Sequence, residues 1–123
     1  MTRTLPVLAR IILGLILLGA GVNGYMVLFG FEPIFPTSPA AMELLQGYLL
    51  VLVKTVEIIC GLLFLTNRFV PLALTATAPL AVNILTFHLF VDPDMLAMGL
   101  IVAILEVYLL WSYRRSFRQL MTM

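Results

Sequence analysis

Residues 52–61 read LVKTVEIICG and place two opposite charges, Lys54 and Glu57, inside an apolar run that extends from Leu44 to Leu65. Because the two charges are three residues apart, they share one face of a helix. A single ionised side chain at the middle of a membrane costs about 2.5–3.5 kcal/mol on insertion scales, so this face avoids lipid. The stretch therefore predicts a helix whose charged face points into the interior of a membrane-embedded bundle.

The composition of the whole chain agrees with a membrane protein. Of its 123 residues, 63% are hydrophobic and 11% are charged, and the mean hydropathy is +1.14, which is more apolar than a soluble domain of this length. The net charge of +1 indicates no nucleic-acid partner. One cysteine and one histidine exclude an intramolecular disulfide, a thiolate metal cluster and ligation of haem by two histidines of one chain. The sequence shows no haem, flavin or metal motif, and the lipid bilayer is the expected surrounding.

Prolines and turn residues divide the chain into four predicted helices, at about 6–29, 39–65, 70–90 and 95–113. The loop GFEPIFPTSP (30–39) contains three prolines that forbid a continuous helix. At about 1.5 Å per residue, each predicted helix can cross a hydrocarbon core of about 30 Å. The predicted fold class is therefore all-α, with residues 1–123 forming a single membrane domain, a four-transmembrane-helix bundle.

The charges near the two ends of the predicted helices indicate how this bundle is oriented. One side carries six arginines, namely Arg3, Arg10, Arg68, Arg114, Arg115 and Arg118. The other side carries only acids, namely Glu32, Glu43, Asp92 and Asp94. The positive-inside rule then places both termini in the cytoplasm of a multi-pass protein in the plasma or inner cell membrane.

Once the charges assigned to one side or the other are set aside, three remain within the predicted helices: Lys54, Glu57 and Glu106. Lys54 lies eleven residues after Glu43 and Glu106 lies eleven residues after Met95, so the two should reach a similar depth, with Glu57 about one turn deeper. Two carboxylates then face one ammonium, and one acid is expected to be protonated, shared, or met by a ligand or water. In one interpretation these three residues form an ion pair that only connects two helices. Charges inside a membrane more often mark a functional site.

Other polar residues extend this predicted site. Asn23, Asn83 and His88 lie toward the outer ends of their helices, and together with Lys54, Glu57 and Glu106 they predict an outward-facing polar cavity that binds a small ligand. In the plainer alternative, the asparagines only bond neighbouring helices and His88 reaches the interface to pair with Asp92.

Small residues predict where helices come close together. The run GLILLGAGVNG (14–24) is typical of a packed helix surface, and Gly47 and Gly61 flank Lys54 at seven residues on the same helix face. Cys60 has apolar neighbours and is expected to be a neutral, inert thiol.

Three segments resemble the DoxX family of small four-helix membrane proteins. They are ARIILGLILLGAG (9–21), EIICGLLFLTNRF (57–69) and LTFHLF (85–90). The resemblance implies a four-helix bundle with both termini inside, and it carries over Glu57 and His88 as functional positions. Members of the family are linked to quinone-coupled thiosulfate oxidation and to membrane redox or stress-response complexes, so quinone is the cofactor that the resemblance implies.

The leading functional hypothesis is an accessory subunit of a quinone-linked membrane redox system, with no catalysis by the isolated chain. Lys54 would hold a ligand oxygen, Glu57 or Glu106 would exchange a proton, and the remaining polar residues would orient the headgroup. Two alternatives stay open: a small proton-coupled transporter or exporter, and a structural or assembly factor for another membrane protein. A membrane redox subunit and a second copy of the chain are the protein partners considered.

Overall fold

The computed structural model describes residues 4–34, 39–44, 47–93 and 96–118, and within these ranges all regular secondary structure is helical. Four long helices, α1 (Thr4–Leu28), α3 (Tyr48–Thr66), α4 (Val70–Phe90) and α5 (Leu96–Ser112), are joined by a short helix, α2 (Pro39–Leu44), and followed by a 3-10 helix, η2 (Arg114–Phe117). The prediction of an all-α protein with four long helices is confirmed. Arg3, Asp94 and Met95 lie outside the described residues.

Three of the four long helices, α1, α3 and α4, are long and apolar enough to cross a membrane. The fourth, α5, is also apolar but has 17 residues. Aliphatic and aromatic side chains cover the outside of the bundle, including Leu15, Leu72 and Val107, as expected for surfaces that face hydrocarbon. These properties give the chain the character of a helical membrane protein.

The prediction of one helix over 39–65 is wrong. The chain instead forms α2 and α3, and Gly47 at the start of α3 has φ 60° and ψ −131°. This backbone conformation lies outside the helical region, and glycine reaches it because it has no Cβ. Gly47 is exposed, with open space where a Cβ would be, so it is not part of a packed surface. The apolar pattern runs through this position, but the backbone conformation at the glycine interrupts the helix.

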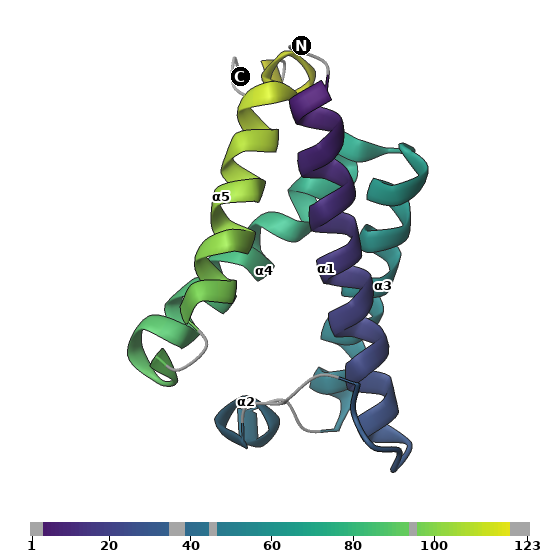
Figure 1. Ribbon diagram of the computed structural model, residues 1–123, viewed down its shortest axis with the longest axis vertical. Coiled ribbons are helices and arrows are strands. Elements are labelled where there is room, and N and C mark those ends of the chain that lie inside the picture. Colours follow the sequence, from purple (N-terminus) through teal and green to yellow (C-terminus); the bar gives the residue numbers. More distant parts are fainter. Residues whose placement is uncertain (1–3, 35–38, 45–46, 94–95, 119–123) are drawn as a thin grey trace.

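The long helices are arranged as two pairs (Figure 1). Helix α1 packs most extensively on α3, and α4 on α5, with smaller contacts between α1 and α5 and between α3 and α4. The two pairs lie close together near the end of the bundle that holds the start of α1 and η2, which we call the terminal end. They diverge toward the opposite end, which we call the loop end.

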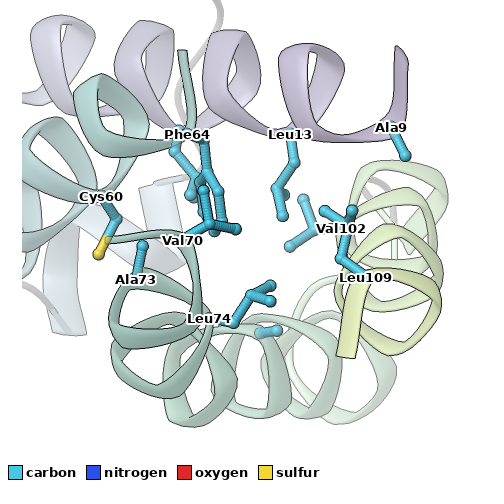
Figure 2. Packing of buried hydrophobic residues seen from close by; sticks show 11 residues of the cluster. Ala9, Leu13, Cys60, Phe64, Val70, Ala73, Leu74, Val102 and Leu109 are labelled. Carbon is cyan, nitrogen blue, oxygen red and sulfur yellow. The ribbon is translucent and has the colours of Figure 1, made fainter. Parts of the chain in front are cut away.

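The hydrophobic core joins both pairs (Figure 2). Leu13 of α1, Phe64 of α3, Leu74 of α4 and Leu109 of α5 are almost completely buried. Because four helices contribute to one cluster, this core holds the pairs together and positions the polar residues of the interior.

Glycines allow α1 and α3 to approach closely. A Cβ on Gly61 would come within 2.8 Å of the Leu18 backbone nitrogen and 2.9 Å of the Gly14 carbonyl oxygen. A Cβ on Gly21 would come within 2.5 Å of Ile58. The predicted packing role of the α1 glycines and of Gly61 is thus confirmed.

Arg10 has a role that its sequence position did not reveal. Its side chain is buried, and its guanidinium donates a hydrogen bond to the carbonyl oxygen of Phe64, in the last turn of α3. Carbonyls in the last turn of a helix have no partner within the helix, and a positive charge there is favourable. Arg10 therefore ties α1 to the end of α3.

Candidate functional site

The centre of the candidate site is an ion pair within one helix. Lys54 Nζ lies 3.2 Å from Glu57 Oε1, and the two side chains are 15% and 4% exposed. Both belong to α3, one of the helices long enough to cross a membrane. The predicted common face is confirmed, and the charged face points into the bundle rather than outward.

Gly24 of α1 leaves room for the side chain of Lys54. A Cβ on Gly24 would come within 2.5–2.6 Å of Cγ, Cδ and Cε of Lys54, so the aliphatic stem of the lysine lies directly over this glycine. The preceding residue, Asn23, is also buried. The glycine-rich run of α1 predicted close packing at Gly24, but no sequence feature indicated that Lys54 is the residue packed there.

A second polar contact joins the same two helices. The hydroxyl groups of Tyr25 and Thr55 form a hydrogen bond, and the ring of Tyr25 stacks on Phe29 at 5.9 Å between centroids. Neither residue was predicted as part of the site. Each is adjacent in sequence to a residue already discussed, Gly24 or Lys54, so the polar contacts between α1 and α3 form a continuous stretch.

Glu106 is buried but stands apart from this pair. Its side chain is 3% exposed, and neither carboxyl oxygen has a hydrogen-bond partner among the described residues. Lys54 is six residues from the start of α3, whereas Glu57 is nine residues from it and Glu106 is ten from the start of α5. The predicted equal depth of Lys54 and Glu106 depended on a helix that began before Glu43, and that helix is interrupted.

Cys60 and Thr77 add polar groups to the interior. Both residues are buried, and the Thr77 hydroxyl donates a hydrogen bond to the carbonyl oxygen of Ala73 at 2.7 Å. The sequence analysis treated Cys60 only as an apolar core residue and did not consider Thr77, because the spacing within α3 does not reveal what α4 and α5 bring to it.

His88 and Asn83 lie on the other helix pair. His88 Nδ1 is 3.2 Å from the main-chain carbonyl oxygen of Asp92, and its ring packs beside Gly99 of α5. The contact with Asp92 agrees with the alternative only in part, because the partner is the main chain and not the Asp92 carboxylate. Asn83 is exposed on α4. No hydrogen bond or ion pair joins either residue to Lys54 or Glu57 in the described part of the chain.

A metal centre has no support within the described ranges, which contain no group of three or more His, Cys, Asp or Glu side chains placed to hold an ion. The site contains the paired ammonium group of Lys54, the paired carboxylate of Glu57 and the separate carboxyl group of Glu106. This donor set can bind an oxygen-rich polar ligand or exchange protons.

Comparison of the chain with protein-family models, with curated proteins and with solved structures finds no match. The DoxX resemblance therefore remains a prediction from three short segments.

Proposed function

We propose that this protein binds a small polar or quinone-like ligand at the Lys54–Glu57 pair and acts as an accessory subunit of a quinone-linked membrane redox system. The observation that carries the proposal is an ion pair with little exposure inside a helix that is long enough to span a membrane. Replacing such a pair by well-packed apolar residues is often neutral or stabilising. A stabilising role alone therefore gives little reason for this ion pair to be present, and this supports a role in binding.

The chemistry of the pair suits a carbonyl or anionic oxygen. An ammonium group has three donors, and the bond to Glu57 uses one of them. The remaining donors would bind the ligand oxygen, Glu57 would accept or release a proton, and the buried Asn23 would orient the headgroup. A ligand that also reached His88 or Asn83 would have to lie between the two helix pairs.

The redox part of the proposal rests on the DoxX resemblance. The sequence has no haem or flavin motif, so a partner subunit would have to hold the electron-transfer group. In the proposed orientation both termini are cytoplasmic and the loop end faces outward from a plasma or inner cell membrane, as the arginine distribution favours.

Native mass spectrometry of the gently extracted protein tests the ligand. We expect the wild type to carry a small molecule that Glu57→Gln loses, because removing a charge-assisted hydrogen bond of about 1.5–3 kcal/mol lowers affinity about tenfold or more. Glu43→Gln is the matched control, since Glu43 is exposed on α2. Bare protein in all three samples, with equal thermal stability, would overturn the ligand proposal.

Proton-coupled transport is a second candidate, favoured by the isolated, buried carboxyl of Glu106. Proteoliposomes with an imposed proton gradient would then accumulate a substrate, and Glu106→Gln would abolish this accumulation while Glu43→Gln would not. Uptake by the Glu106→Gln protein at the wild-type rate would exclude this candidate.

A further inference from the structure

Glu106 differs from every other acid that the structure describes in this interior. Its carboxyl is almost completely buried, and neither oxygen accepts or donates a hydrogen bond within the described ranges. It shares the inward face of α5 with Gly99, Val102 and Leu109. The carboxyl is therefore held inside the bundle without the polar contacts that normally accompany a buried charge.

The two basic residues inside the bundle are already engaged. The ammonium of Lys54 is bound to Glu57, and the guanidinium of Arg10 is bound to the carbonyl oxygen of Phe64. Glu57 thus has the only lysine of the chain as its partner. Of the two acids buried in the described part of the bundle, Glu106 is the one that has no ion-pair partner there.

The remaining bases are also accounted for. His88 of α4 is bonded to the Asp92 carbonyl, and Arg114 of η2 donates to the Trp111 carbonyl while lying 4.4 Å from the centroid of its ring. The other arginines of the described chain are exposed, namely Arg68, Arg115 and Arg118. Within the described residues, no positive side chain is paired with Glu106.

An ionised carboxylate in this position would be expensive. Burying an unpaired charge costs several kcal/mol even after relaxation, and such a group binds a proton instead.

We infer that Glu106 is a buried proton-binding site, neutral in the resting protein and distinct from the Lys54–Glu57 pair. The inference stands apart from the proposed ligand function, because it holds whether or not the pair takes a ligand. It also has a consequence: Glu106 can release its proton only when a positive charge or water reaches the bundle interior. Entry of a cation would therefore displace one proton from this carboxyl.

Infrared spectroscopy of the detergent-solubilised full chain at neutral pH tests this. We expect an absorption band from a protonated carboxyl group in the wild type that disappears in Glu106→Gln and persists in Glu43→Gln. Since glutamine closely resembles a neutral glutamic acid in shape and charge, Glu106→Gln should also keep the wild-type Tm.

Two results would overturn the inference. The first is a wild-type spectrum without a protonated-carboxyl band at neutral pH. The second is a band that remains unchanged in Glu106→Gln, which would assign the proton to another acid. If Glu106→Gln failed to fold, Glu106→Asp would replace it, and a band of unchanged position and size in that variant would count against Glu106 as its source.

Discussion

At the scale of single residues, the ion pair of Lys54 and Glu57 lies within α3 and does not connect two helices. Contact with α1 comes instead from the lysine stem, which packs over Gly24. The pair therefore neutralises its own charges locally, while the apolar part of Lys54 contributes to helix packing.

The pair can be tested by single and double replacement. Lys54→Met leaves Glu57 buried without its cation, and breaking a buried pair in this way typically costs about 3–5 kcal/mol. We expect a large drop in Tm in detergent for Lys54→Met and recovery of most of it in Lys54→Met/Glu57→Gln. Arg115→Met serves as the control, because Arg115 is exposed. Equal stability of Lys54→Met and the wild type would show that the pair is solvated.

Arg10 is predicted to stabilise the contact between α1 and the end of α3. Arg10→Ala removes a hydrogen bond from a charged donor to the Phe64 carbonyl, and such bonds contribute about 1.5–3 kcal/mol. The Tm should fall for Arg10→Ala and remain unchanged for Arg118→Ala, which alters an exposed arginine. Should both variants melt together with the wild type, the bond to Phe64 would be dispensable.

At the scale of helices, α1 and α3 form the most closely packed pair, and small residues make this approach possible. The atoms nearest to a Cβ on Gly61 are backbone atoms of α1, which cannot move aside as the end of a flexible side chain could. Any larger residue at this position must therefore push the two helices apart.

We predict that Gly61→Leu destabilises the protein by about 1–3 kcal/mol, the usual cost of overpacking. Ala97→Leu is the control, because it also introduces a leucine side chain into a helix but at an exposed position, on α5. Chemical unfolding followed by circular dichroism measures both variants. A wild-type midpoint for Gly61→Leu would mean that the helices can separate at little cost.

At the scale of the whole molecule, the two helix pairs share one core near the terminal end and diverge toward the loop end (Figure 1). Lys54 and Glu57 belong to one pair, and His88 and Asn83 belong to the other. A single site that includes all of them would have to bridge the two pairs.

The proposed orientation predicts which end of the bundle is accessible from outside the cell. In a Cys60→Ala background, a membrane-impermeant maleimide should label Ile34→Cys in intact cells, since Ile34 is exposed beyond the end of α1. Arg115→Cys, near the terminal end, should react only after the membrane is opened. The reverse pattern of labelling would place both termini outside.

Local properties of the sequence were enough to predict the helical class, four long helices and the inward direction of the charged face of α3. Hydropathy, prolines and a three-residue spacing act over one or two turns of helix, so they can be read from neighbouring residues. Three features depend instead on how helices distant in sequence rotate and pack. They are the packing of the Lys54 stem on Gly24, the burial of Arg10 and the lack of a bonding partner for Glu106. The break at Gly47 required the backbone conformation itself, because a single glycine within a largely apolar run fits a continuous helix as well as an interrupted one.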